Sequence, residues 1–410
     1  MQAAMSENMS DHSDPGDKYI SAYTSWASGG WGANLTGIPS ASTTASLSNT
    51  LIVGNVEVSA IYREADDTIA VPQSVTQQTR DAWTKWALAA QREDTAGIVQ
   101  IVHAGRQALG GTGGRGFFGK SIAPSAIGVK LGNNPLERLF SSMVFGTPRE
   151  MTVEEIGEVA QQFAAAAKLA HESGFKGVEI HAAHGYLLSS FLSPKMNQRH
   201  DEYGGTAAKR ARIVIEVIRA VRKAVPTSFC VGLKINSADV GGAESLEESL
   251  EQVGLIIAEQ IDFIEISGGT YENVRFAEGD NPGSTRTAQR EAFFLDYARA
   301  VRERYPNVTL MVTGGFRSRK GMEAAIESNS CDLIGIGRPA AAFPHLPKDL
   351  LLNMDVEDID AVVELAKVTG NWFVRMLPIK FINLGMDTLY YAAQIRKMGI
   401  GQVPKPPPTS

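Results

Sequence analysis

The sequence predicts an α/β protein built as a single (β/α)8 TIM barrel. From residue 97 onward, short runs rich in β-branched residues alternate with longer stretches that have the period of a helix. The strand-like runs are almost continuously apolar, as parallel strands buried on both faces require. An open doubly wound sheet is the alternative, but no GxGxxG turn follows the first predicted strand.

The elements follow one another as repeated strand–helix units, which indicates a parallel sheet. Two strands are expected near the start, a very short one at 2–6 and a longer one at 51–58. Six more are expected at 97–103, 176–181, 229–236, 262–267, 308–313 and 332–337, with helices at 153–173, 209–225, 244–260 and 291–305. Eight strands complete a barrel, and we expect residues 1–410 to form one domain.

Composition excludes several classes of protein. With 39 basic and 45 acidic residues the net charge is −6, which does not suggest binding to nucleic acid. No apolar run reaches the ~18 residues of a membrane span, and the start lacks the features of a secretory signal, so we expect a cytoplasmic protein with no membrane partner. Cys230 and Cys331 lie far apart in apolar segments, which excludes a disulfide scaffold and a multi-cysteine metal site.

Three segments depart from a regular barrel. The chain begins only two residues before AAMSEN (3–8), so we expect an incomplete first strand. Residues 33–50 form an uncharged insert with little periodicity, and with the short start they suggest an error in the gene model; a tolerated surface loop is the alternative. The proline-rich end, 403–410, is expected to be a stiff, disordered tail.

Polar side chains gather where predicted strands end, which is where such barrels carry their active sites. His181 and His184 end one strand, and Tyr186 follows just beyond. The two histidines can be metal ligands, core imidazoles, or donors to one substrate oxygen. Because no third ligand accompanies them, we expect no metal site and favour the donors. Tyr186, a phenol at neutral pH, can supply a proton.

Lys234 is flanked by two apolar residues on its strand, so alternation directs its side chain toward the mouth of the barrel. A buried ammonium needs an anionic partner. Lys234 can belong to a structural ion pair, act as a Schiff-base nucleophile as in lysine-dependent aldolases, or lie beside an electron-rich cofactor ring. We favour the cofactor ring.

Glycines follow the last two strands, as Gly314-Gly315 and as Gly337 before Arg338. Tight turns would also place glycines there. Barrels commonly hold a phosphate at these two strand ends, where bare backbone N–H groups can approach it, and an arginine adds positive charge. We therefore expect a phosphate site.

The chain resembles the Old Yellow Enzyme family of FMN-dependent oxidoreductases. The longest matching stretch, 148–212, contains GVEIHAAHGYLLSSFLSPKMNQRHDEYGG. Shorter matches are AAMSEN (3–8), QIVHAGRQ (100–107), APSAIG (123–128), VGLKIN (231–236), DFIEISGGTYE (262–272), VTGGFRS (312–318) and GIGRP (335–339).

The resemblance implies a role for each candidate residue around FMN. Lys234 would face the N1/O2 edge of the flavin, where many members carry arginine instead. His181 and His184 would hold a substrate carbonyl oxygen, and Tyr186 would protonate the α-carbon while flavin N5 delivers hydride to the β-carbon. The residues expected to contact the rest of the cofactor are Ala4, Met5 and Ser6 at the ring edge, Gly54 at the neighbouring strand end, Gln100 at the pyrimidine, and Gly314, Gly315, Gly337 and Arg338 at the phosphate.

The function implied is therefore that of an NAD(P)H:flavin oxidoreductase, or ene-reductase. NADPH or NADH would reduce FMN, and a small activated alkene, conjugated to a carbonyl group, would reoxidise it. Two alternatives stay open: an aldolase that works through Lys234, and a defective barrel that binds no flavin because its first strand is curtailed. The alkene, the choice between NADH and NADPH, and the oligomeric state are not readable from the sequence.

Overall fold

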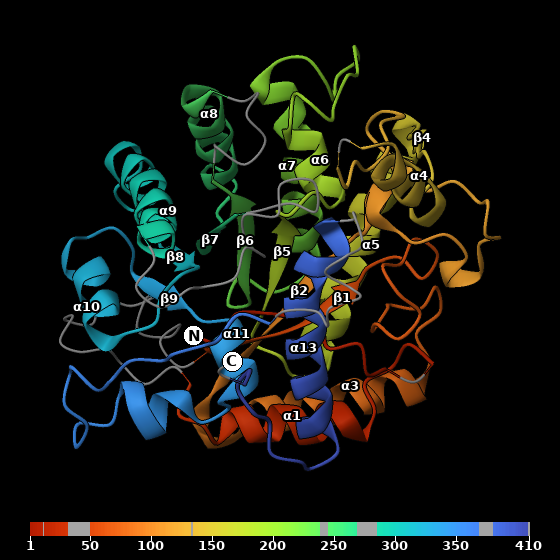
Figure 1. Cartoon of the computed structure of the whole chain (residues 1–410). Coiled ribbons are helices and arrows are strands. Elements are labelled where there is room, and N and C mark those ends of the chain that lie inside the picture. The colour runs from red at the N-terminus through yellow and green to blue at the C-terminus, as the bar shows by residue number, and fades with distance from the viewer. Residues whose placement is uncertain are drawn as a thin grey trace.

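The chain forms a curled parallel sheet wrapped in helices, seen from one side in Figure 1. The structure, a computed structural model, describes residues 1–10, 12–31, 50–132, 134–237, 245–268, 285–368 and 380–408. Seven strands pair in parallel, each with its neighbour in space. In order around the sheet they are β1 (Thr50–Glu57), β2 (Ala96–Val102), β5 (Gly177–Ala182), β6 (Cys230–Asn236), β7 (Phe263–Ser267), β8 (Leu310–Thr313) and β9 (Leu333–Gly335).

Helices cover the outside of the sheet, and each of the four predicted helices is present. Polar caps begin several of them; Thr152, for example, accepts from the backbone N–H of Glu155 at the start of α5, and Glu155 reciprocates in a capping box. The helices are α1 (Asp17–Ala27), α3 (Gln77–Ala90), α4 (Pro135–Val144), α5 (Val153–Glu172), α6 (Leu187–Leu192), α7 (Ala207–Ala224), α8 (Leu246–Ile257), α9 (Thr285–Arg304), α10 (Arg319–Glu327), α11 (Arg338–Ala342) and α13 (Lys380–Gly399). None of the described helices is long and apolar enough to cross a membrane.

Residues 1–3 close the ring between β9 and β1. Gln2 forms parallel bridges with both Leu51 and Ile336. The N–H of Ala3 donates to the carbonyl of Ile336 at 2.9 Å, and the N–H of Ile52 donates to the carbonyl of Gln2 at 3.2 Å. The expected strand at 2–6 is thus reduced to pairing around one residue. That residue nevertheless bonds on both sides, so the first strand is incomplete, as expected, but still closes the ring.

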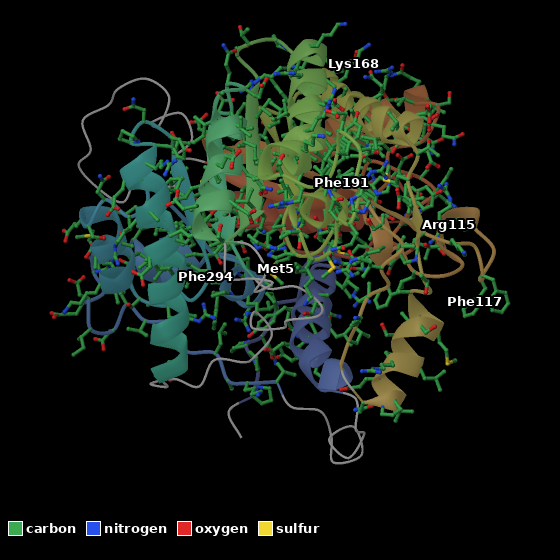
Figure 2. All side chains as sticks on the ribbon, turned by 90° about the horizontal axis from the view of Figure 1, so that it is seen from above. Met5, Arg115, Phe117, Lys168, Phe191 and Phe294 are labelled. Atoms are coloured by element: carbon green, nitrogen blue, oxygen red, sulfur yellow. The ribbon has the colours of Figure 1, made fainter. Side chains whose placement is uncertain are left out.

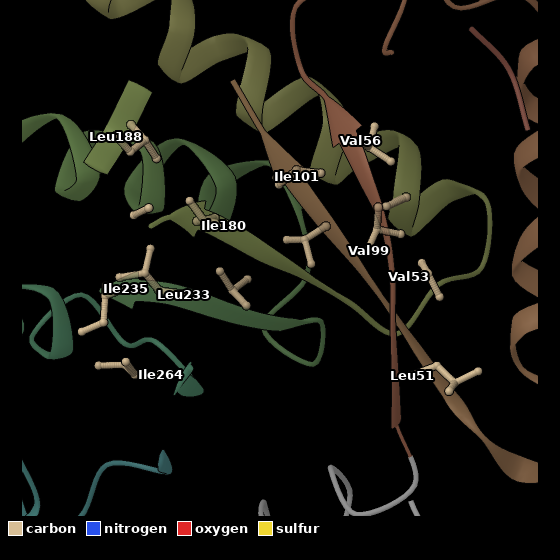
Figure 3. Packing of buried hydrophobic residues seen from close by; sticks show 14 of the residues in the cluster. Leu51, Val53, Val56, Val99, Ile101, Ile180, Leu188, Leu233, Ile235 and Ile264 are labelled. Atoms are coloured by element: carbon tan, nitrogen blue, oxygen red, sulfur yellow. The ribbon is translucent and has the colours of Figure 1, made fainter. Parts of the chain in front are cut away.

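Side chains alternate between the outside and the inside of the sheet. Apolar residues at every second position, such as Leu51, Val53 and Val99, pack outward against the helices in one continuous cluster (Figure 3). A separate small cluster, formed by Ala3, Ile52, Ile98, Phe263, Met311 and Leu333, comes from the intervening positions and fills the interior. The polar inward residues that follow along the same strands therefore lie above an apolar plug.

The atypical segments differ from expectation at their edges. Thr50, assigned above to the insert, is the first residue of β1 and pairs with Ala96, while residues 32–49 lie outside the described part of the chain.

The tail is ordered as far as residue 408: Pro404 and Pro407 are buried, and the N–H of Lys405 donates to Gln394 Oε1 at 3.0 Å. Polar side chains of α13 bond to the tail backbone, which is why the expected disorder is wrong for 403–408.

Candidate active site

A cavity of about 250 Å³ opens at the carboxyl ends of the strands. Its walls come from segments far apart in the sequence, and Figure 2 shows Met5, one of its lining residues, near the middle of the molecule. Twelve of the thirteen predicted site residues line this cavity: Ala4, Met5, Ser6, Gln100, His181, His184, Tyr186, Lys234, Gly314, Gly315, Gly337 and Arg338. The structure therefore gathers almost the whole predicted set around one space.

Gly54 is the predicted residue that does not line the cavity. It lies in a register irregularity of β1 with φ of 74°, and a Cβ there would come within 3.2 Å of Trp86. Its N–H donates to the hydroxyl of Tyr23 at 2.7 Å. The next residue, Asn55, faces the cavity instead, so Gly54 shapes the strand end that presents Asn55.

The rings of His181 and His184 contact each other, and they do not both point at one common site for a substrate oxygen. His181 Nδ1 accepts the N–H of Ala183 at 3.2 Å, which places its ring proton on Nε2. Nε2 lies 3.2 Å from His184 Nδ1, and His184 Nε2 lies 3.2 Å from the hydroxyl of Ser267. With this arrangement the N–H of His184 faces Ser267, and a ligand oxygen would have to compete for both N–H groups.

Both imidazoles are held neutral. Burial lowers the pKa of His184 to about 3, with a further contribution from the positive charge of Lys234. Burial likewise lowers the pKa of His181 well below its usual value, with His184 and Lys234 acting in the same direction. Neutral imidazoles carry one N–H each, so the pair can donate hydrogen bonds to an oxygen without bringing a charge of its own.

Tyr186 is nearly buried, with 5% of its surface exposed, and stands against His181 with the ring centres 4.9 Å apart in an edge-to-face contact. Its hydroxyl donates to the carboxylate of Glu64 at 3.0 Å. Glu64 lies in the loop after β1, which the sequence did not single out. The phenol therefore joins the cavity to a carboxylate 122 residues away in the chain.

Lys234 faces the cavity and also forms a buried ion pair, Nζ to Glu265 Oε1, at 2.8 Å. Burial alone would lower the pKa of Lys234, but the carboxylates of Glu265 and Glu179 outweigh it and the pKa lies above its usual value. Burial raises the pKa of Glu179 well above the normal range, and the charge of Glu265 adds to this effect. Glu265 stays ionised because Lys234 lowers its pKa despite burial. We therefore describe the cluster as a charged Lys234–Glu265 pair with a protonated Glu179, to which Gln100 Nε2 donates.

The glycines at the ends of β8 and β9 leave backbone exposed to the cavity. Gly314 and Gly315 have φ of 142° and 84°, conformations that side chains rarely adopt. A Cβ on Gly337 would meet only Met5, at 3.8 Å, so this backbone borders open space. Arg338 lies beside it, and its Nη1 pairs with Asp387 Oδ2 of α13 at 3.1 Å.

Sequence reasoning missed several lining or supporting residues. Glu179 and Glu265 had a visible signal, because each is a charged residue at an inward position of an otherwise apolar strand, as Lys234 is. No sequence signal marked Asn55, Asp387 or Glu64. Only tertiary contacts bring Asn55 and Asp387 to the cavity, and Glu64 to Tyr186. Among the described residues, no group of three His, Cys, Asp or Glu side chains is arranged to hold a metal ion.

Comparison with known proteins gives consistent similarities. Residues 41–355 match the family model described as "NADH:flavin oxidoreductase / NADH oxidase family". The chain is 39% identical over 393 residues to the NADH-dependent flavin oxidoreductase iliE of Hypocrea jecorina, covering 95% of this chain and 94% of that protein. It is 42% identical over 383 residues to the NADH-dependent flavin oxidoreductase iccE of Talaromyces variabilis, with 92% and 88% covered.

One relative is considerably longer. The NADH-dependent flavin oxidoreductase iliE of Neonectria sp. is 40% identical over 421 residues, which is 98% of this chain but 53% of the relative. The chain thus spans about half the length of that protein.

Solved structures share the fold. Morphinone reductase in complex with tetrahydroNAD superimposes with a TM-score of 0.63 at 20% identity, covering 85% of this chain and 84% of its own. A complex of 2-naphthoyl-CoA reductase gives 0.68 at 24% identity, with 85% and 49% covered.

Proposed function

The chain belongs to the NADH:flavin oxidoreductase / NADH oxidase family, whose members use FMN and draw electrons from NADH or NADPH, and we propose that it reduces activated alkenes. The observation that carries this proposal is the meeting of His181, His184 and Tyr186 on one wall of the cavity. Residues 1–410 act in it as one domain, a proposal supported by the large apolar cluster that includes both Met9 and Met398.

The cavity fits the flavin on two counts. The glycine backbones at the ends of β8 and β9 form a cradle beside Arg338, which suits a phosphate. On β1, Asn55 Oδ1 is buried without a hydrogen-bond partner, and such an orphaned acceptor suits the polar edge of a ring system. Gln100 and Lys234 would face the pyrimidine part. Bound FMN would supply hydride transfer from the nicotinamide to the alkene.

The side chains of this protein would then orient and protonate the substrate. His181 and His184, both neutral, would donate their N–H groups to the carbonyl oxygen and polarise the conjugated double bond. Tyr186 would give its phenolic proton to the α-carbon. Lys234 stays protonated beside Glu265, so a Schiff-base reaction, which needs the free amine, is not supported.

Stopped-flow measurement of the two half-reactions tests the proposal. NADH should reduce the bound flavin under anaerobic conditions, and 2-cyclohexenone should reoxidise it. Tyr186→Phe should slow reoxidation by ~10²–10⁴-fold and leave reduction by NADH unchanged, because only reoxidation needs the proton.

The matched control is Tyr203→Phe. Tyr203 is also buried and also donates to a glutamate, Glu216, at 3.0 Å, but it lies outside the cavity. It should leave both half-reactions unchanged. Failure of a panel of enones to reoxidise the reduced wild-type protein would contradict the proposed function.

A further inference from the structure

The phenol of Tyr186, a lining residue of the cavity, bonds to a carboxylate that is not part of the lining. Its hydroxyl donates to Glu64 Oε2 at 3.0 Å. Tyr186 is nearly buried, whereas Glu64 is half-exposed and is not a lining residue of the cavity. The pair therefore links the inner wall of the site to the solvent side of the loop after β1.

The loop holds Glu64 in place by contacts on both sides. The N–H of Glu64 donates to Glu57 Oε1, at the end of β1, at 2.9 Å. The guanidinium of the preceding residue, Arg63, is buried and donates to the hydroxyl of Ser13 and to the carbonyl of Asp66, both at 2.9 Å. The carbonyl of Arg63 accepts from the N–H of Leu109 at 3.1 Å. These contacts fix the backbone on both sides of Glu64, so its carboxylate is held in place against the hydroxyl of Tyr186.

A buried phenol that gives up a proton in each catalytic cycle has to recover one. His181 stands against the ring of Tyr186, but its Nε2–H is directed to His184, and both imidazoles are neutral. The carboxylate of Glu64 is already hydrogen-bonded to the phenol and has access to water. Its position suits the return of the proton.

We propose that Glu64 is the positioning residue that returns a proton from solvent to Tyr186 after each alkene reduction. This inference rests on the proposed function. As the O–H bond of Tyr186 breaks, a C–H bond forms at the α-carbon and the tyrosine is left as a phenolate. The carboxylate of Glu64, which accepts from this hydroxyl in the resting site, takes a proton from solvent. The new O–H bond of Glu64 then breaks as the proton passes to the phenolate oxygen, which restores both the phenol and the carboxylate. The electron pair of the reduction arrives with the hydride, so Glu64 is neither oxidised nor reduced.

The charges around Glu64 suit this exchange. Glu57 faces it from β1, Arg63 adjoins it in the loop, and Tyr186 contacts it from the segment after β5. Burial, and next the negative charge of Glu64, raise the pKa of Glu57 well above its usual value, so Glu57 is neutral. Glu64 therefore carries the negative charge of this carboxyl pair and is the member that can accept a proton from water.

The decisive variant is Glu64→Gln, because the amide oxygen can still accept from the phenol but the side chain cannot deliver a proton. Reduction of the flavin by NADH should be unchanged. Reoxidation by 2-cyclohexenone should slow at least about tenfold, and its dependence on pH should flatten. The effect is smaller than the ~10²–10⁴-fold of direct general acid catalysis because Glu64 acts through Tyr186. In the Tyr186→Phe background the same change should have no further effect.

Two further variants separate proton transfer from support of the ring. Glu64→Ala should regain rate when formate is added, because a small carboxylic acid can occupy the space. Asp66→Asn, an exposed carboxylate of the same loop whose Oδ1 accepts from the N–H of Gly113, should behave as wild type.

A reading without turnover comes from NMR of protein labelled with ¹³Cζ-tyrosine, with Tyr186→Phe assigning the signal. In Glu64→Gln the phenol of Tyr186 should ionise at a lower pH than in the wild type, because the negative charge beside its hydroxyl is gone.

Wild-type reoxidation rates in Glu64→Gln would overturn the relay and leave the proposed function intact. Equal slowing of both half-reactions in Glu64→Gln, with no rescue of Glu64→Ala by formate, would also overturn the relay. That result would assign Glu64 a structural role. If no enone reoxidises the wild-type protein, the proposed function falls and the relay falls with it.

Discussion

At the scale of single residues, the interior of the barrel mouth carries more ionisable groups than its single lysine suggested. Lys234 and Glu265 form a pair with side chains 4% and 0% exposed, and Glu179 adds a neutral carboxyl group. Buried charges of this kind stabilise a fold little when paired but cost several kcal/mol when one partner is removed. Glu265 therefore keeps Lys234 protonated, and the cavity has a positive charge at this position.

Glu265→Gln should destabilise the protein by about 3–5 kcal/mol, because it leaves the ammonium of Lys234 buried without its ionised partner. Adding Lys234→Met to Glu265→Gln should recover most of that loss. Urea unfolding measures both effects.

The control is Glu259→Gln. Glu259 pairs with Arg219, whose side chain is 66% exposed, and the loss should stay below about 1 kcal/mol. If Glu265→Gln lowered the free energy of unfolding no more than Glu259→Gln does, burial of the Lys234–Glu265 pair would not matter for stability.

At the scale of elements, the N-terminal segment is held to the barrel by a second buried carboxyl group. Glu7 follows the cavity-lining residues Met5 and Ser6, is 3% exposed, and accepts from the hydroxyl of Tyr23 on α1. That hydroxyl in turn accepts the N–H of Gly54 from β1. One carboxyl group thus joins the segment that closes the ring to a helix and a strand.

This contact predicts a pH dependence of stability. Burial raises the pKa of Glu7 to about 7 from 4.5, although the hydrogen bond from Tyr23 opposes the shift. Because the native state binds this proton more tightly than the unfolded chain, the contribution is complete below about pH 4.5 and is lost as the pH rises through 7. The difference corresponds to about 3 kcal/mol.

Melting temperatures between pH 5 and 8.5 test this dependence. Glu7→Gln, which stays neutral throughout, should lose less stability across that range than wild type. Glu158→Gln, at an exposed position of α5, should follow the wild-type curve. Parallel curves for wild type and Glu7→Gln would contradict the assignment.

At the scale of the whole molecule, the C-terminal helix reaches back to the barrel mouth. α13 packs against α1 and α11 (Figure 1). Its Asp387 is 5% exposed and lines the cavity beside Arg338. The carboxylate also accepts the N–H of Val368 at 3.1 Å. Asp387 therefore holds Arg338 next to the glycine backbones, where the phosphate of FMN is proposed to bind.

Arg338→Met should weaken binding of FMN by roughly 10–150-fold, the loss of a hydrogen bond to a charged group worth ~1.5–3 kcal/mol. Riboflavin, which lacks the phosphate, should bind the variant and the wild type equally. Fluorescence titration of flavin-depleted protein measures both affinities.

Arg299→Met serves as the control, because Arg299 lies on α9 and its Nη1 pairs with Asp296 away from the cavity. Equal weakening of FMN and riboflavin binding by Arg338→Met would place the effect in general destabilisation of the site.

The local pattern of the sequence was sufficient for the strands, the main helices and most of the site. Each of the seven strands of the large sheet appears within three residues of its predicted bounds, because an apolar run between polar turns carries its own signal. In a parallel barrel all strands end at the same rim, so residues such as His181, Lys234 and Gly314 could be placed together without knowledge of their contacts.

Only the tertiary structure decided which partners these residues take. Gln2 closes the ring through backbone bonds to strands that lie 49 and 334 positions away, which no local pattern encodes. The donation of Tyr186 to Glu64, the pairing of Lys234 with Glu265, and the approach of Asp387 to Arg338 likewise depend on how separate elements pack. Residue type and strand position determine which groups reach the rim, because alternation along a strand is local. The charge and proton state of those groups follow from burial and neighbours, which exist only once the chain has folded.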